Sequence, residues 1–374
     1  MASIVTYVSR PSPKQSGIVE DIRRRIISGE YAPGAQLPTI AQMQQRHGAS
    51  PVTVRRAVRY LRERGFIRTE ERSGMYVAEE PPCLCNLGLV LPFYNYTSQF
   101  LTALENEARR LSETEPSPSE PTRRFSFFNE IDGPSDDTRQ HHADLFEAVE
   151  TETVGGLIFA GYMGRFAETP VVQNPHVPCV AMTEFPLPGI IAFRLTGFVE
   201  KAVDLLAARG RRRIALITRG ENAGSICEAF ASLVEEHGMT THPWWIHGVY
   251  AGVAGWARNC TELLLHSGNG ERPDAIIIAD DNLVPAATAG VAAAGVRVPD
   301  DADVVAHTNF PWPTPAAVPV SRVGYDIRHV MRMAVDVIER KRRGEQMQDE
   351  VTLMACLEAE ALVSDASEVA LTHA

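Results

Sequence analysis

Short, continuously apolar runs alternate with helix-like segments along most of this chain, from about residue 87 onward. Strands that are apolar at every position are buried on both faces, and helices between them are the usual crossovers of a parallel sheet. The pattern predicts an α/β fold of doubly wound parallel sheets, and its length predicts two lobes rather than one. The apolar runs are 87–91, 125–128, 156–160, 178–182, 190–193, 213–218, 275–279 and 303–307. The segments predicted to be helical are 98–111, 138–150, 197–209, 225–237, 252–266, 283–294 and 326–342.

The first 80 residues differ from the rest of the chain in charge. They hold thirteen Lys and Arg against eight Asp and Glu, a net charge of +5, whereas the whole 374-residue chain carries −11. The remainder is therefore strongly acidic. A small basic module joined to a large acidic one indicates that only the first meets a polyanion such as nucleic acid.

Three helices and a short hairpin are predicted within the basic module. Ser50 is placed to cap the third helix, and Pro51 suits its first position, where a missing N–H costs nothing. The alternating segment 66–77 predicts two strands with a turn at 72–74, which is the wing of a winged helix fold. The predicted helices, from apolar residues at spacings of three and four, are 16–28, 40–46 and 51–64.

The third helix carries its basic residues opposite its apolar stripe. A helix fits the major groove, its N-terminal residues reach base edges, and Arg can pair bidentately with guanine. Two helices joined by a short turn, the second with a basic leading face, form a helix-turn-helix that binds double-stranded DNA. The residues predicted to contact DNA, including the cap of the second helix and the wing, are Thr39, Ser50, Val52, Thr53, Arg55, Arg56, Arg59, Arg72 and Gly74.

Residues 15–78 resemble the winged helix-turn-helix of the GntR family of bacterial transcription regulators. The chain departs from the family pattern in two ways: Ile40 and Ala41 follow the Leu-Pro-Thr step where an Arg is usual, and Arg72 replaces the first wing glycine. One customary DNA contact is therefore missing, and Arg72 can supply another. The resemblance rests on Gly34, Leu37-Pro38-Thr39, Gly48-Ala49-Ser50, the string from Thr53 to Val58, and Gly74-Met75-Tyr76-Val77.

Residues 87–363 resemble the effector domain of LacI-family repressors, which has a periplasmic-binding-protein-like fold. The resemblance implies that the chain crosses between two lobes three times and that a small molecule, usually a sugar or a nucleobase, binds in the cleft. GntR-type regulators with this kind of C-terminal domain typically answer to sugars. The segments that carry the resemblance are 88–92, 154–158, 210–217, 273–281 and 295–305.

Ligands of open α/β sheets bind in the loops at the carboxyl ends of the strands. Aromatic, carboxylate and amide side chains there suit a ligand rich in hydroxyl groups. Gly224 and Thr308 or Asn309 stand where the LacI family usually has its ligand-binding Arg and Asp. The predicted effector-binding residues are Phe93, Tyr94, Arg194, Asp280, Asp281, His307, Asn309, Tyr325 and Asp326.

Arg194 has two interpretations. It follows the apolar run 190–193 and is expected in a strand-to-helix loop, where its guanidinium could bind a hydroxyl pair, a carboxylate or a phosphate. The alternative is a salt bridge to Asp280 or Asp281. Tyr325 and Asp326 are assigned to the site only because the family resemblance places the last crossover helix there.

The chain is predicted to have four parts. These are a winged helix-turn-helix domain at 11–78, a linker at 79–86, a two-lobed effector domain at 87–363 and a disordered tail at 364–374. No export signal or membrane span is present, so a cytoplasmic protein is expected. The six scattered cysteines make no disulfide framework. No catalytic constellation, cofactor motif or metal-ligand spacing is found, so no catalytic residue, cofactor or metal is predicted.

Two classes of function compete. The leading hypothesis is a ligand-responsive transcription regulator, in particular a repressor. A homodimer would bind a palindromic operator, and a sugar-like effector in the interlobe cleft would change its DNA affinity. The alternative is a cytoplasmic small-molecule-binding protein or an enzyme of related fold. The lack of an export signal and of a catalytic constellation favours the regulator.

Overall fold

The computed structural model describes residues 13–70, 73–93, 97–114, 122–129, 140, 142–161, 164–183, 187–220, 223–266 and 271–361. Contacts divide the chain into two compact units. The first takes the residues up to Pro92, Ala108–Ala192 and Ala334–Asp349. The second takes Phe93–Glu107, Phe193–Met333 and the residues from Glu350. The predicted tail, 364–374, lies outside the described residues.

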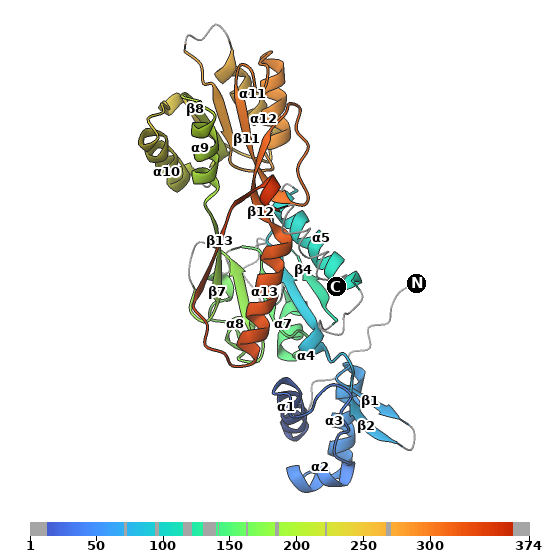
Figure 1. Cartoon of the computed structure of the whole chain (residues 1–374). Helices are drawn as coiled ribbons and strands as arrows, with labels where there is room; N and C mark the ends of the chain where they lie inside the picture. The colour runs from blue at the N-terminus through green and yellow to red at the C-terminus, as the bar shows by residue number, and fades with distance from the viewer. Residues whose placement is uncertain are drawn as a thin grey trace, which may run out of the picture. The chain divides into compact units, whose positions relative to one another are not determined.

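The first unit begins with three helices and a two-stranded hairpin (Figure 1). β1 and β2 pair antiparallel, from Ile67 opposite Val77 to Glu70 opposite Gly74. The apolar faces of the helices meet in one core, which also takes the start of the hairpin. Both the three predicted helices and the predicted wing are confirmed. The elements are α1 (Pro13–Ile27), α2 (Ile40–His47), α3 (Pro51–Glu63), β1 (Ile67–Glu70) and β2 (Gly74–Val77). The core includes Ile18, Ile22, Ile26, Val54, Ala57, Leu61, Phe66 and Val77.

Local capping determines where α2 and α3 begin. Thr39 and Gln42 form a capping box: the Gln42 N–H donates to Thr39 Oγ1 at 3.3 Å, and the Thr39 N–H donates to Gln42 Oε1 at 2.8 Å. α2 ends at Gly48, whose φ of 56° is a left-handed conformation that glycine adopts without a Cβ clash. The Thr53 N–H then donates to Ser50 Oγ at 3.2 Å, which starts α3 after a short turn.

The predicted linker contains a one-turn helix, α4 (Pro82–Cys85). Cys83 packs into the same apolar core as α1 and α3. Arg342 Nη1 donates at 3.1 Å to the carbonyl oxygen of Cys83 and at 3.1 Å to that of the next residue. Gly155 permits this close approach, because a Cβ there would lie 2.3 Å from the Cys83 oxygen. The linker segment is therefore packed and hydrogen-bonded within the first unit.

One six-stranded sheet has the order β13-β7-β6-β5-β3-β4. β3 pairs parallel with β4 on one side and with β5 on the other, and β5 pairs parallel with β6. Its strands are β3 (Asn86–Val90), β4 (Arg124–Phe128), β5 (Leu157–Phe159), β6 (Cys179–Met182), β7 (Ile191–Thr196) and β13 (Glu350–Met354). The accompanying helices are α5 (Gln99–Glu113), α7 (Ala143–Glu150), η1 (Gly164–Phe166), α8 (Pro170–Gln173) and α13 (Ile327–Arg342).

The second six-stranded sheet has the order β14-β12-β11-β10-β8-β9. All of its pairings are parallel except that of β12 with the short edge strand β14. α9 packs on α10 and α11 on α12, and Figure 1 shows the two pairs on opposite faces of the sheet. The strands are β8 (Ile214–Arg219), β9 (Ile246–Val249), β10 (Ala275–Ile278), β11 (Asp303–Phe310), β12 (Ser321–Asp326) and β14 (Cys356–Leu357). The helices are α9 (Phe198–Ala208), α10 (Ala223–Glu236), η3 (Pro243–Trp245), α11 (Ala254–Leu265) and α12 (Val284–Ala293).

The predicted fold class is confirmed, and every apolar run named above forms a strand. Four strands were not predicted: β9, β12, β13 and β14. Their sequences mix polar residues and glycine with apolar ones, as in IHGV and SRVGYD, so they lack the continuous apolar run that marks a strand buried on both faces. The antiparallel edge at β14 was also not foreseen.

Candidate nucleic-acid interface and effector site

α3 presents a row of exposed arginines along one face. Arg55, Arg56 and Arg59 are exposed, whereas the opposite face of the helix is buried in the core. None of these three guanidinium groups has a hydrogen bond or an ion pair to any residue that the structure describes. Unpaired positive charge on an exposed helix is suited to DNA phosphates and to the acceptor atoms of guanine.

The first turn of α3 adds smaller side chains to this face. Val52 is 56% exposed, which is unusual for a valine and leaves its methyl groups available to an apolar contact such as a thymine methyl. Ser50 Oγ and Thr53 Oγ1 lie 2.9 Å apart and share one hydrogen bond at the helix start. Thr39 is also exposed, at the start of α2. The predicted residues of α2 and α3 therefore occupy exposed positions, except Thr53, which is half-buried.

The wing is held against the segment that precedes α2. Gln36 Nε2 donates to the Ser73 carbonyl oxygen at 3.1 Å, and a Cβ added to Gly74 would lie 3.0 Å from that same nitrogen. Gly74 has φ 128°, which favours glycine. Arg72 lies outside the described residues. Gln36 was not predicted, although its place between Gly34 and Leu37, inside the family motif, was a signal.

Four predicted effector residues come together at the carboxyl ends of β10 and β11 in the second unit. Asn309 Nδ2 donates to Asp281 Oδ2, and the two side chains are buried. His307 lies two residues before Asn309 and so on the same face of β11. Asp280 is the second residue after β10, and Asp281 follows it. The prediction that strand ends gather these residues agrees with this geometry.

Burial changes the protonation of this cluster. It raises the pKa of the Asp281 carboxyl to about 7, with the neighbouring Asp280 charge acting in the same direction. Burial lowers the pKa of the His307 imidazole to about 4, so the ring is neutral near pH 7. Among the described residues, neither His307 Nδ1 nor Asn309 Oδ1 has a hydrogen-bond partner. Buried polar atoms of this kind usually bind water or a ligand.

Aromatic rings border the same cluster. The His307 ring meets Phe198 edge-on, with 5.1 Å between ring centroids, and lies 5.6 Å from the ring of Tyr325. Tyr325 is the residue paired with Asn309 in the parallel ladder between β12 and β11. The site therefore combines ring faces with carboxylate, amide and imidazole groups, the mixture found where polyhydroxyl ligands bind.

Arg219 was missed by the sequence analysis. It is the last residue of β8, and its Nε lies 2.9 Å from Asp280 Oδ2. Asp280 Oδ1 in turn accepts from the N–H of Asn282 at 2.9 Å and from its side-chain amide at 2.7 Å. In the family pattern the usual Arg falls near Gly224 instead. The available signal was that Arg219 is the residue directly after the apolar run 213–218.

The remaining predicted residues lie in other surroundings. Arg194 is inside β7, not in a loop after it, because the strand continues to Thr196. Its Nη1 lies 3.3 Å from Glu350 Oε1 rather than near Asp280 or Asp281. Asp326 forms a two-point ion pair with Arg328, with 3.0 Å from each carboxylate oxygen to its donor. Phe93 is exposed, and Tyr94 lies outside the described residues.

Within the described part of the chain, no group of three or more His, Cys, Asp or Glu side chains could hold a metal ion. The same residues contain no helix long and apolar enough to cross a membrane. All six cysteines are free thiols, and burial raises the pKa of the Cys83 and Cys179 thiols to about 12.

Two family models match the chain, one on each side of the linker. Residues 14–77 match the model of bacterial regulatory proteins of the gntR family, and residues 203–359 match the periplasmic binding protein-like domain. The chain thus joins a GntR-type DNA-binding domain to a periplasmic-binding-protein-like domain, and the predicted family resemblance is confirmed.

A curated relative is the mannosyl-D-glycerate transport/metabolism system repressor MngR of Escherichia coli K12. It is 43% identical over 68 residues, which are 18% of this chain and 28% of the relative. The match therefore spans less than a third of the length of that protein.

Solved structures of LacI-type regulators share the fold of the larger part of the chain. A LacI family transcriptional regulator from Lactobacillus casei with bound sucrose is 20% identical, with a TM-score of 0.54 over 73% of this chain and 98% of its own. A LacI family regulator from Arthrobacter sp. FB24 in complex with lactose is 19% identical, with a TM-score of 0.54 over 73% of this chain and 97% of its own.

Proposed function

We propose that this protein is a transcription regulator that binds double-stranded DNA through α3 and responds to a small-molecule effector bound by its second unit. The observation that carries the proposal is the exposed row of Arg55, Arg56 and Arg59, which makes no polar contact with the described residues and lies within the segment that matches the gntR family model. The Escherichia coli relative is named a repressor, which supports repression as the activity of this regulator. Such a protein acts in the cytoplasm, where the chromosome lies.

The DNA-bound form that we propose is a homodimer on a palindromic operator. One winged helix-turn-helix reads only a few base pairs, and two α3 helices related by a two-fold axis read half-sites about 34 Å, one helical turn, apart. The basic module would meet the DNA, while the acidic remainder of the chain would be repelled by it. The functional division that we propose follows the predicted boundaries, 11–78 and 87–363, on either side of the linker.

DNA binding is tested with the full chain and fragments of its own genome. Bound fragments are selected and sequenced, and the dissociation constant for the recovered site is then measured by fluorescence anisotropy at several salt concentrations. We expect a palindromic site, one protein dimer per site by light scattering, and a dissociation constant that rises steeply with salt. Recovery of no common site would contradict the regulator and leave the small-molecule-binding protein or enzyme as the better hypothesis.

The effector that we propose is a sugar-like polyhydroxyl molecule. Its site contains His307, Asn309, Asp280 and Asp281 of the second unit, where two buried polar atoms lack a partner within the described residues. LacI-type regulators of the same fold were solved with sucrose, glucose and lactose bound. The further candidates that we propose for this site are Phe93, Tyr94, Tyr325 and Asp326. Arg194 is the least favoured candidate, because it lies on β7 and is paired with Glu350.

A thermal-shift screen of sugars, nucleosides and amino acids finds the effector, because a ligand that binds only the native state raises the melting temperature. The variant His307→Phe tests the site. It keeps a ring against Phe198 but removes Nδ1, so we expect effector affinity to fall about tenfold, as for the loss of one hydrogen bond. His237→Gln serves as the control, because His237 follows α10 and contacts Asp204 and the Leu233 carbonyl oxygen. It should bind effector as the wild type does. Equal affinity in both variants would remove His307 from the site.

A further inference from the structure

A pocket of about 450 Å³ opens at the edge of the second sheet that is opposite the carboxyl-end cluster of His307 and Asn309. It is lined by the residues that lead into β8, β11 and β12, and thus by the amino ends of those strands. His307 and Asn309 lie four and six residues beyond Asp303 along β11, so they are about 13 Å and about 20 Å from this edge. The pocket is therefore separate from the proposed effector site.

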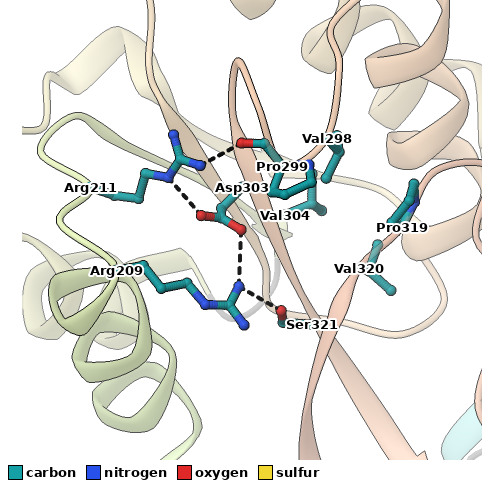
Figure 2. Close-up of a pocket in the computed structure, with 9 residues that line it drawn as sticks. All are labelled: Arg209, Arg211, Val298, Pro299, Asp303, Val304, Pro319, Val320 and Ser321. Carbon is teal, nitrogen blue, oxygen red and sulfur yellow. Dashed lines mark hydrogen bonds and ion pairs between the residues drawn. The ribbon is translucent and has the colours of Figure 1, made fainter.

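Two guanidinium groups form one wall of this pocket (Figure 2). Arg209 Nη1 donates to Asp303 Oδ1 at 2.9 Å and to Ser321 Oγ at 2.8 Å. Arg211 Nε donates to the other oxygen, Asp303 Oδ2, at 2.6 Å, and its Nη2 donates to the Pro299 carbonyl oxygen. The buried Asp303 carboxylate thus fixes both arginines in place with one oxygen each.

The charge in the pocket is not balanced by these contacts. Two guanidinium groups face one carboxylate, which leaves a net charge of +1 among the lining residues. Each guanidinium has five N–H donors, and the described contacts use two on each. The Arg209 side chain is 41% exposed and that of Arg211 is 21% exposed, so the remaining donors can be reached from solvent.

The opposite wall is apolar. Figure 2 shows Val298, Pro319 and Val320 across the pocket from the two arginines. A ligand that fits both walls carries an anionic group for the guanidinium donors and an aliphatic body for the valine and proline side chains. The volume is within the range of small-molecule sites, roughly 300 to 1,000 Å³.

We propose that this pocket binds a small aliphatic carboxylate, as a ligand site additional to the one for the effector. The carboxylate would lie on the free N–H edges of Arg209 and Arg211, in the plane that a guanidinium offers for two-point pairing, and the aliphatic chain would lie on Val298 and Val320. The site does not depend on the proposed regulator function, because it uses neither α3 nor the carboxyl-end cluster.

Calorimetric titration of the full-length protein with 4-methylpentanoate tests the proposal, with the neutral 4-methylpentanamide and inorganic phosphate as comparison ligands. We expect the carboxylate to bind at least tenfold more tightly than either. Arg209→Ala leaves Arg211 paired with Asp303 and should weaken binding at least fivefold. Arg212→Ala removes the same charge from the adjacent, exposed position that does not line the pocket, and should bind as the wild type does.

The apolar wall is tested with Val320→Thr, which keeps the side-chain shape and replaces one methyl group with a hydroxyl. We expect it to weaken 4-methylpentanoate severalfold and to leave any binding of phosphate unchanged. The proposal is overturned if 4-methylpentanoate does not bind, if Arg209→Ala binds it as well as Arg212→Ala does, or if the amide binds equally well. Phosphate that binds as tightly as the carboxylate would also overturn it, because the apolar wall would then contribute nothing.

Discussion

The arginine face of α3 and the carboxyl-end cluster of the second sheet are built in opposite ways. Arg55, Arg56 and Arg59 are exposed and make no polar contact with the described residues. Asp281 and Asn309, by contrast, are 2% and 1% exposed and bind each other. The α3 face presents positively charged side chains to solvent, where a partner can bind them. The second region is a buried cluster whose side chains already form hydrogen bonds with one another.

This difference determines how each region tolerates substitution. An exposed arginine without a partner contributes little to folding, so its removal should change binding and leave stability near the wild-type value. A buried carboxylate that accepts hydrogen bonds, such as Asp281, affects both binding and stability, because removing it alters desolvation and leaves Asn309 without this partner. The variants below test this contrast.

The largest effect is expected for DNA affinity. Arg55→Ala or Arg56→Ala should each cost about 1 to 3 kcal/mol of operator binding. Base preference would be lost if the contact is to a base, and the salt dependence would become shallower if it is to a phosphate. Anisotropy titrations over a range of salt concentrations measure both, and thermal unfolding should remain near the wild-type midpoint.

The matched control is Arg258→Ala, an exposed arginine of α11 that changes the net charge by the same amount. It should bind the operator like the wild type, since it lies in the second unit. Normal operator affinity in both α3 variants would show that this face does not meet DNA. A large loss of stability in these two variants would contradict the expectation that exposed arginines on α3 contribute little to folding.

The next effect concerns stability and pH at Asp281. Its folded pKa of about 7 is above the ordinary value of 3.8, so the folded protein holds this proton more tightly than the unfolded chain. The stability that this proton confers is complete at low pH and is lost as pH rises through 7. Asp281→Asn removes that loss. We expect the unfolding free energy of the variant, relative to wild type, to rise by about 2 kcal/mol from pH 5 to pH 8.

Urea unfolding of both proteins at each pH gives this difference. The opposite dependence of His307, whose pKa of about 4 favours folding as pH rises above it, is present in both proteins and cancels in the comparison. Asp300→Asn, at an exposed carboxylate, is the control for the loss of one acidic side chain. An Asp281→Asn difference that is flat with pH would place an ionised Asp281 in the folded protein.

Much of the fold could be predicted because burial on both faces imposes a continuous apolar run. The segments RIALIT and AIIIA could hardly be anything but central strands, and they are β8 and β10. β12 could not be predicted in this way, because SRVGYD has no continuous apolar run and contains a glycine, Gly324. Only glycine fits there, since a Cβ added to it would lie 1.7 Å from the Thr308 carbonyl oxygen. Such a requirement depends on the neighbouring strand, which the local sequence does not contain.

The two candidate sites differ in the same respect. The α3 face follows from helical periodicity within thirteen residues, so the exposed arginines could be predicted one by one. The effector cluster joins strands that are far apart in the chain. Arg219 matters because it is paired with Asp280, in the loop after β10. Arg194 differs from its predicted setting because Glu350 of β13 lies beside it. Neither pairing is encoded locally.

A smaller effect separates folding from DNA binding at one residue. Ser50 caps α3 and is also predicted to contact DNA, so Ser50→Ala should cost about 1 kcal/mol of unfolding free energy through the lost cap. Ser50→Asn keeps a capping oxygen and should restore stability. If its DNA affinity is also restored, the role of Ser50 is structural. Loss of affinity in the stable Asn variant would support a direct contact.

The smallest effect is expected at Arg194, which tests whether the cluster extends to β7. The Arg194–Glu350 ion pair joins side chains that are 47% and 42% exposed, and water screens such a pair. Arg194→Ala should therefore lower the unfolding free energy by less than about 1 kcal/mol. Because the guanidinium lies on β7 and is paired with Glu350, not with Asp280 or Asp281, we expect effector affinity to change less than twofold.

Glu350→Gln is the companion variant: removing either partner of a structural pair should give the same small loss of unfolding free energy. A tenfold loss of effector affinity in Arg194→Ala alone, with Glu350→Gln unaffected, would assign Arg194 to the ligand and extend the buried cluster to an exposed residue.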